Sequence, residues 1–136
     1  ADNAVDVVFH LQGSRIVWVS PSVEAAFGDP PAHWVGSDLR DRVHPDDLDY
    51  LDKVATTMRE MAPGARATAR FRVRTADGGY HWVDGNSKQY VDADGNIDGT
   101  IAALRIVDEQ VEAQQRLDRA QQRDGDRGRD QDPPFV

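Results

Sequence analysis

Histidine, serine and carboxylate side chains are the groups in this sequence that could carry out catalysis or bind a metal ion. The 136 residues include four histidines and 24 aspartates and glutamates, but no cysteine. Without cysteine there is no thiol nucleophile, thiolate metal site or disulfide. The sequence also contains no GxSxG nucleophile elbow, no phosphate-binding P-loop and no HExxH zinc motif. We therefore expect this chain to have no enzyme active site of its own.

Two acidic stretches could bind a divalent cation, and one of them lies at residues 92–96. A calcium-binding EF-hand loop that started at Asp92 would require glycine at its sixth position and glutamate at its twelfth. Those positions hold Ile97 and Ala103, so the loop does not fit. A solvated hairpin turn is the better interpretation.

The other acidic stretch holds Asp46, Asp47 and Asp49, which could bind Mg²⁺ weakly. Asp46 and Asp47 follow Pro45, however, where a helix is predicted to begin. Carboxylates in the first turn of a helix are stabilised by the partial positive charge at its amino end. This electrostatic role explains the first two carboxylates, and we predict no metal site.

The overall charge makes several classes of partner improbable. The chain carries a formal net charge of −8. Nucleic-acid binding requires clustered lysine and arginine, and an anionic membrane surface repels an acidic protein, so we expect neither as a partner. No apolar run approaches the ~20 residues needed to cross a bilayer, and no signal peptide is visible. We expect a cytoplasmic protein, with which the absence of cysteine is compatible.

The amino-terminal part of the sequence predicts two short strands and two short helices. Residues 5–11 and 15–19 are rich in β-branched and aromatic residues, and a Gln-Gly-Ser turn separates them. Ser20 and Pro21 then fit the cap and the first position of a short helix. Residues 32–39 predict one further turn of helix, which ends near Gly36.

A longer helix is predicted to begin at Pro45 and to end before a Pro-Gly pair at residues 63–64. Its apolar residues recur every three or four positions, which places them on one face of a helix. They are Leu48, Leu51, Ala55, Met58 and Ala62.

Residues 67–107 change to the period of two that is typical of strands. Apolar and polar residues alternate over 67–74, and two further strands are predicted over 80–91 and 97–107. Asp-Gly-Gly and Asp-Gly-Asn sequences separate these strands and predict tight turns. Three strands joined by two tight turns form an antiparallel meander.

A helical pattern returns after the last strand and is predicted to end near residue 122. A weak coiled-coil seam, with spacings of three, four and three, is formed by Gln110, Ala113, Leu117 and Ala120. Because only one of these is a large apolar residue, the helix should be marginal alone and should need a partner. Residues 124–136 are charged and glycine-rich, and we expect them to form a mobile tail.

Four motifs, taken in order, resemble those of the PAS family of sensory domains. They are the Ile-Val-Trp-Val-Ser-Pro-Ser segment at 16–22, the passage at 36–47 that ends in Val-His-Pro-Asp-Asp, the Asp-Gly-Gly-Tyr-His-Trp hairpin at 77–82 and the acidic hairpin at 92–99. The resemblance covers about residues 5–109. It implies an α+β fold, in which a five-stranded antiparallel sheet carries short helices on one face and a C-terminal helix follows.

This resemblance also implies a division of the chain. Residues 1–109 would form the PAS sensory domain, residues 110–123 the output or dimerisation helix, and residues 124–136 the tail. In many PAS domains an Asp-Ile-Thr triplet ties the last strand to the output helix. The corresponding residues here are Ile106, Val107 and Asp108, so the usual contact is not implied. Asp108 could still cap the helix.

PAS domains can enclose a small organic ligand, and the alternative is a close-packed core without one. The side chains expected to point into such a pocket are Phe27, Trp34, Leu39, Leu51, Met58, Phe71, Val73 and Leu104.

The resemblance does not identify a cofactor. A covalent flavin adduct requires a cysteine and is excluded, whereas non-covalent flavin is not. Haem is not expected, because no histidine lies in the helix predicted over residues 46–61; the histidines are His10, His33, His44 and His81. For His44, within the His-Pro-Asp-Asp motif, we expect a structural or capping role.

The resemblance thus implies a sensory and signal-relay module of a larger, bacterial-type signalling protein. It would form a homodimer, could sense a small ligand, and would signal through its C-terminal helix. An effector domain, such as a histidine kinase or a diguanylate cyclase, would lie outside this chain. The alternative is a ligand-free module that binds another protein. A third hypothesis, a small-molecule enzyme of unrelated fold, would require a different strand order.

Overall fold

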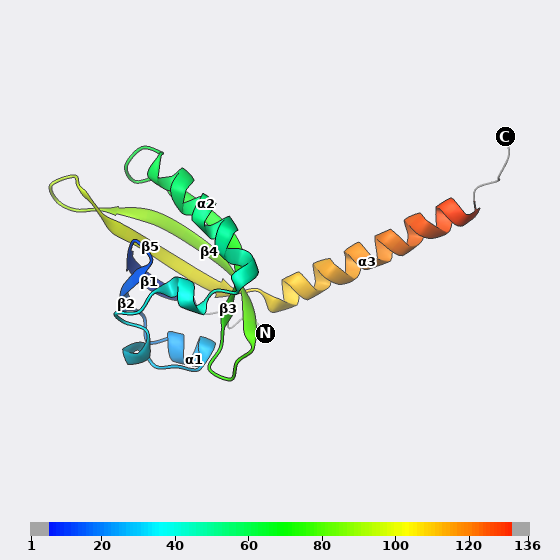
Figure 1. The fold of residues 1–136 in the computed structure, drawn as a ribbon, viewed down its shortest axis with the longest axis horizontal. Helices are drawn as coiled ribbons and strands as arrows, with labels where there is room; N and C mark the ends of the chain where they lie inside the picture. Colours follow the sequence, from blue (N-terminus) through cyan, green and yellow to red (C-terminus); the bar gives the residue numbers. More distant parts are fainter. Residues whose placement is uncertain (1–5, 132–136) are drawn as a thin grey trace.

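Five strands form one antiparallel sheet in the computed structural model, which describes residues 6–131 of the chain (Figure 1). Their spatial order is β2-β1-β5-β4-β3. The strands are β1 (Val7–Gln12), β2 (Arg15–Val19), β3 (Arg66–Arg74), β4 (Tyr80–Val91) and β5 (Ile97–Ile106). The helices are α1 (Val23–Phe27), α2 (Leu48–Arg59) and α3 (Asp108–Gln131), with 3-10 turns at Pro31–His33, Leu39–Arg42 and Pro45–Asp47. This arrangement confirms the α+β fold predicted from the sequence.

Strand β1 joins the amino-terminal hairpin to the meander of β3, β4 and β5. It pairs with β5 from Val7 opposite Leu104 to Leu11 opposite Thr100. Gly99 precedes the last of these pairs with a φ of 98°, and a Cβ atom there would lie 2.1 Å from the Leu11 carbonyl oxygen. Only glycine tolerates both this backbone conformation and this close approach, so the junction between the two halves of the sheet requires glycine at this position.

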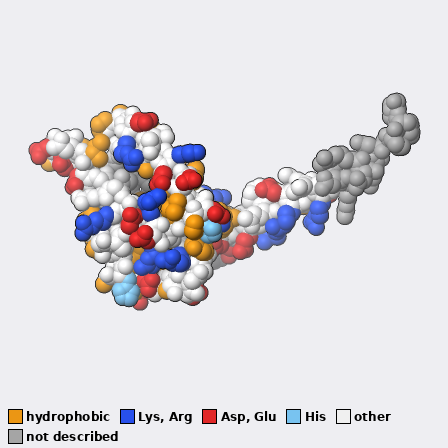
Figure 2. Space-filling view, viewed as in Figure 1, with side chains coloured by type: hydrophobic (Ala, Val, Ile, Leu, Met, Phe, Trp, Pro, Cys, Tyr) orange, Lys and Arg blue, Asp and Glu red, His pale blue; other side chains and the backbone are white. Residues whose placement is uncertain are grey.

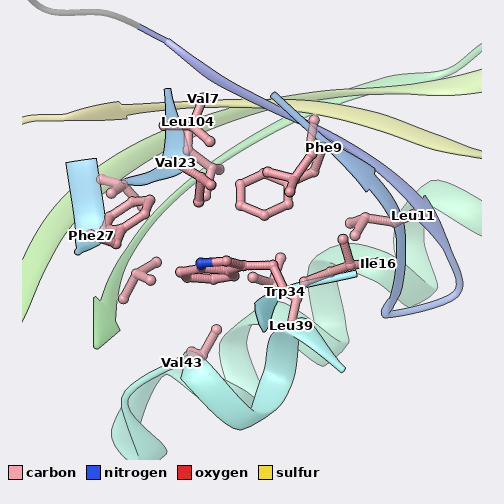
Figure 3. Close-up of a cluster of buried hydrophobic side chains, with 14 of the residues drawn as sticks. Val7, Phe9, Leu11, Ile16, Val23, Phe27, Trp34, Leu39, Val43 and Leu104 are labelled. Atoms are coloured by element: carbon pink, nitrogen blue, oxygen red, sulfur yellow. The ribbon is translucent and has the colours of Figure 1, made fainter. Parts of the chain in front are cut away.

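The short helices and α2 cover one face of the sheet, and the core lies between these two layers (Figures 1 and 3). Trp34 is fully buried near its centre, with ring centroids 5.8 Å from Phe9 and 5.7 Å from Phe27. The indole nitrogen donates to the carbonyl oxygen of Asp29 over 3.1 Å, and the Arg42 guanidinium lies 3.9 Å from the ring centroid. Aromatic packing of this kind fills this end of the core.

Helix α1 begins at Val23, later than the Ser-Pro pair predicts. The side chain of Ser20 is engaged elsewhere, because its Oγ accepts a hydrogen bond from the backbone nitrogen of Val8 over 2.9 Å. This serine therefore ties strand β1 to the start of the helical layer instead of capping the helix.

The turn of helix predicted over residues 32–39 is confined to Pro31–His33. After Trp34 the backbone turns to the edge of β2. The nitrogen of Gly36 donates to the Ile16 carbonyl oxygen over 2.8 Å, and the nitrogen of Ile16 donates to the Ser37 carbonyl oxygen over 2.9 Å. Hydrogen bonds to the sheet edge thus satisfy backbone groups that a helix would have paired internally.

Helix α2 follows a 3-10 turn that His44 caps. The His44 Nδ1 atom accepts a hydrogen bond from the backbone nitrogen of Asp46 over 3.1 Å. The capping role predicted for this histidine is confirmed.

Helix α3 leaves the domain at the end of β5 and extends away from it (Figure 1). It continues to Gln131, although the sequence predicts an end near residue 122. Gly125 and Gly128 lower helix propensity by about 1 kcal/mol each but keep the backbone N–H that a helix needs. Residues 132–136 of the predicted tail lie outside the described residues, and the mobility of the tail stays a prediction. Over residues 6–131, no helix is long and apolar enough to cross a membrane.

Candidate functional site

A cavity of about 570 Å³ lies between α2 and the sheet. This volume is within the range of small-molecule sites in proteins. Two rows of cross-strand neighbours form much of its floor, and they are Ala67–Ser87–Ala102 and Ala69–Gly85–Leu104. Because neighbours across antiparallel strands point to the same face, small side chains lie side by side beneath the helix. The gap between the two layers therefore follows from small residues in register on three strands.

Helix α2 forms the opposite wall with its apolar side. Leu51, Val54 and Met58 line the cavity from this helix, and Leu11 closes it from β1. Met58 is buried, whereas Leu51 and Val54 are only half-buried. Side chains that are apolar but incompletely packed are typical of a wall that faces open space.

One end of the floor is closed by large side chains that depend on Gly85. A Cβ atom at this position would lie 3.0 Å from Cδ2 of Leu104 and 3.2 Å from Cε1 of Phe71. The absence of a side chain therefore lets these two residues pack over the strand and bound the cavity.

The side chains predicted to line a pocket separate into two groups. Leu39, Leu51, Met58, Phe71 and Leu104 line the cavity.

Phe27, Trp34 and Val73 do not line the cavity and lie in the packed part of the core. Figure 3 shows the Trp34 ring among the aliphatic and aromatic side chains of that cluster. The period of two or of three to four predicts which side chains point inward. It does not predict whether space remains beside them.

Gln89 is a buried polar residue of the lining that the sequence interpretation missed. Its side chain is only 4% exposed, and its Nε2 atom donates to the Met58 carbonyl oxygen over 3.1 Å. The signal was present in the alternation of β4, because Gln89 is in phase with the buried residues Val83 and Gly85.

The mouth of the cavity carries charged residues. Arg40 donates to both carboxylate oxygens of Asp52, over 3.1 and 2.9 Å, and so links the second 3-10 turn to α2. Both residues line the cavity, as does Arg59, and all three are exposed. The charges therefore meet solvent at the rim, while the interior is mainly apolar.

Asp47 anchors the amino end of α2 to β3. Its carboxylate accepts hydrogen bonds from the backbone nitrogen, Nε and Nη2 of Arg72, over 2.8, 3.0 and 2.8 Å. The Arg72 hydrogen bonds hold the pKa of the Asp47 carboxyl below its usual range, although partial burial opposes the effect. The carboxylate therefore has a specific partner on the sheet, beyond the favourable helix start predicted from the sequence.

The acidic hairpin at residues 92–96 forms a turn, as the sequence predicts. The Asp92 carboxylate accepts hydrogen bonds from the backbone nitrogens of Asp94 and Asn96, over 2.9 and 3.0 Å. These contacts within the loop account for the acidic residue that begins it.

The first turn of α3 is joined to β4 through Asp108. Strand β5 ends at Ile106, and the nitrogen of Val107 still donates to the Trp82 carbonyl oxygen over 2.8 Å. The Asp108 Oδ1 atom then accepts from the Trp82 nitrogen over 2.7 Å, while Oδ2 lies 2.5 Å from Nδ1 of His81. A carboxylate thus takes the place of the backbone carbonyl that a longer β5 would have supplied.

The predicted seam on α3 is largely exposed. Gln110 and Ala113 are exposed, Leu117 is 51% exposed and Ala120 is half-buried. On the face shown in Figure 2, the described part of α3 carries basic and acidic side chains and little hydrophobic surface. Val111, which the seam does not include, is buried against the domain.

The histidines lie outside the cavity lining. His81 stands at the joint with α3, and His44 caps a 3-10 turn. His33 is exposed, and the ring of His10 lies 5.5 Å from that of Tyr90.

Comparisons with known proteins agree with this architecture. A family model described as the PAS fold matches residues 16–104. Among solved structures, the PAS-B domain of Drosophila melanogaster Cycle with bound ethylene glycol has a TM-score of 0.67 and 15% identity, over 76% of this chain and 100% of that chain. The N-terminal domain of a diguanylate cyclase with PAS/PAC sensor from Marinobacter aquaeolei has a TM-score of 0.63 and 22% identity, over 79% and 98%. A sensory box histidine kinase/response regulator from Burkholderia thailandensis E264 has a TM-score of 0.67 and 16% identity, over 88% of both chains. At these identities the similarity shows a shared fold.

Proposed function

This chain belongs to the PAS fold family, and from that premise we propose that it is a sensory and signal-relay module of a larger signalling protein. In this proposal a small organic ligand occupies the cavity beneath α2, and its presence is relayed to α3. The module works in the cytoplasm. Any catalytic output, such as that of a kinase or a diguanylate cyclase, belongs to a domain outside this chain.

The observation that carries the proposal is that the strands lining the cavity also hold the start of α3. Ala102 and Leu104 of β5 line the cavity, and α3 begins at Asp108 directly after this strand. Strand β4 lines the cavity through Gly85, and its Trp82 nitrogen donates to Asp108 at the start of the same helix. A ligand that separated α2 from the sheet would therefore act on the two strands that set the direction of α3.

Native mass spectrometry and an absorption spectrum of the purified chain test the sensing part. We expect an additional mass, or an absorption band beyond that of the aromatic residues, that is lost on denaturation. A bare polypeptide mass that also fails to shift when small apolar molecules are added would count against ligand sensing.

The exposed seam of α3 supports dimerisation as the second part of the proposal. Burying the half-exposed Leu117 side chain against a second copy would contribute about 1–2 kcal/mol per chain. We expect light scattering to give a dimer for the chain and a monomer for Leu117→Glu. Gln115→Glu, which adds the same charge outside the seam, should remain dimeric. A chain that is monomeric before substitution would rule out this role of the seam.

A second candidate function, protein binding without a ligand, is favoured by the outer face of the sheet. Trp18 is 50% exposed and pairs across the strands with His10, which in turn pairs with Ile101. Tyr90 is 44% exposed and contacts His10. These side chains form an aromatic surface away from the cavity, and such surfaces are common at protein interfaces. Two results together would favour this function: a native mass equal to that of the polypeptide without a ligand, and loss of partner binding in Trp18→Ser.

A further inference from the structure

The Gln89 amide carries a buried oxygen that lacks a hydrogen-bond partner. Among the described residues, Oε1 of Gln89 is the one buried side-chain oxygen or nitrogen atom without a hydrogen-bond partner. Buried polar groups in proteins are nearly always paired, and each exception calls for an explanation such as a ligand or a water molecule. Gln89 borders the cavity, so this amide belongs to the wall that a bound molecule would contact.

The orientation of the amide follows from its other contact. The Nε2 group donates to the carbonyl oxygen of Met58, which can only accept. A flipped amide would bring two acceptors together at that contact, so the nitrogen must face Met58. The oxygen is therefore the atom that Gln89 offers to an occupant of the cavity.

The neighbours of Gln89 define the rest of the binding surface. Gln89 pairs across the strands with Thr100, and the adjacent row consists of Ala67, Ser87 and Ala102. The small side chains of this row keep that part of the floor close to the backbone. A planar ring system would lie on such a floor with the apolar side of α2 above it.

The charges of the cavity argue for a neutral ligand. Arg40 and Asp52 neutralise each other at the rim, and Arg59 is exposed to solvent. An anion placed beside Gln89 would meet the amide oxygen and would lose its hydration without gaining a buried cation, because Arg59 is exposed. A neutral molecule with an O–H or N–H group would instead satisfy the unpaired acceptor.

From these observations we propose that Gln89 selects uncharged planar aromatic ligands that carry a hydrogen-bond donor. The aromatic body lies between α2 and the floor of small residues, and the donor meets Oε1 of Gln89. This inference rests on the proposed ligand-sensing function and adds the chemical class of the ligand and the residue that recognises it.

Three compounds with the same ring system test the proposal on the full chain. They are 2-naphthol, which has a donor, 2-methoxynaphthalene, which lacks it, and 2-naphthoate, which is an anion. Binding is followed by chemical-shift changes in ¹H–¹⁵N NMR spectra, including the side-chain amide of Gln89. We expect 2-naphthol to bind at least about tenfold more tightly than either of the other two.

Two variants assign the preference to one side chain. In Gln89→Met, which keeps the length of the side chain and removes the amide, the preference for 2-naphthol over 2-methoxynaphthalene should vanish or reverse. Lys88→Met, the same substitution at the next residue of the strand, should keep it, because Lys88 is exposed and does not line the cavity. The dispersion of the NMR spectrum shows whether each variant is folded. If Gln89→Met is unfolded, the shift of the Gln89 side-chain amide in the unmodified chain still decides the question.

The outcomes separate this inference from the function on which it rests. Equal binding of 2-naphthol and 2-methoxynaphthalene, a preference unchanged in Gln89→Met, or a preference lost in Lys88→Met alone would overturn the role of Gln89 and leave ligand sensing intact. If none of the three compounds binds and the purified chain carries no ligand, both the inference and ligand sensing fail.

Discussion

Replacement of Asp108 by alanine should loosen the joint between the sheet and α3. The substitution removes the acceptor that lies 2.7 Å from the Trp82 nitrogen and the partner of His81. A hydrogen bond to a charged acceptor contributes about 1.5–3 kcal/mol, and water reaches this half-buried carboxylate, so we expect a loss of about 1–2 kcal/mol in the free energy of unfolding. Asp108→Asn retains one acceptor oxygen and should lose less.

Urea denaturation measures the global loss, and amide hydrogen exchange measures the local one. The Trp82 N–H donates to the Asp108 side chain, so its exchange rate reports this contact directly. We expect faster exchange at Trp82 and in the first turn of α3 in Asp108→Ala, and little change at Val83 in the same strand. Glu109→Ala, an exposed substitution one residue further along α3, should change stability by less than about 0.5 kcal/mol.

An unchanged exchange rate at Trp82 in Asp108→Ala would refute this account of the joint. The same conclusion would follow if Asp108→Ala and Glu109→Ala had equal effects on stability. In either case the helix would be held by the burial of its apolar residues, and the carboxylate would not couple β4 to α3.

Three further predictions concern the sheet, the anchor of α2 and the cavity. Gly99→Ala should destabilise the fold by at least about 2 kcal/mol in urea denaturation, because its Cβ would lie 2.1 Å from a carbonyl oxygen of β1, whereas Gly95→Ala meets open space and should cost about 1 kcal/mol. The pKa of the Asp47 carboxyl is lower in the folded state because Arg72 donates to it, so the unfolded state takes up its proton first and stability should fall as the pH drops below about 4. Asp47→Asn should remove this part of the acid sensitivity. Urea midpoints at pH 6 and pH 3 measure it, and an equal fall in the variant and in the unmodified chain would contradict the prediction. Ala69→Leu should fill the cavity and abolish binding of 2-naphthol while the protein stays folded, and binding that survives would place the ligand elsewhere.

Local sequence patterns were sufficient to predict most of the sheet. Residues 15–19 and 80–91 form strands with the predicted bounds, because residue composition and the turn sequences that flank a strand are local properties of the chain. The apolar stripe that begins at Leu48 likewise predicted α2. The resemblance of four motifs to one family added the order of these elements, which the structure and the family match confirm.

Predictions of the short helices were less accurate because distant backbone groups compete for the same hydrogen bonds. Ser20 was predicted to cap a helix, yet its hydroxyl binds the backbone of β1. A turn of helix ending near Gly36 was predicted, yet it is shorter, and residues 36–37 bind the edge of β2. These partners are remote in the sequence or become available only when the sheet has formed.

The candidate site shows the same difference between what the local sequence predicts and what tertiary contacts decide. Inward-pointing residues such as Met58 and Phe71 could be identified from their spacing, because side-chain direction follows from the backbone period. Whether they would meet a packed core or a cavity depended on the summed volume of side chains from several strands and α2. Those strands come into register only through long-range pairing. For the same reason the unpaired oxygen of Gln89, and the contact by which Asp108 extends the edge of β5, became visible only in the folded chain.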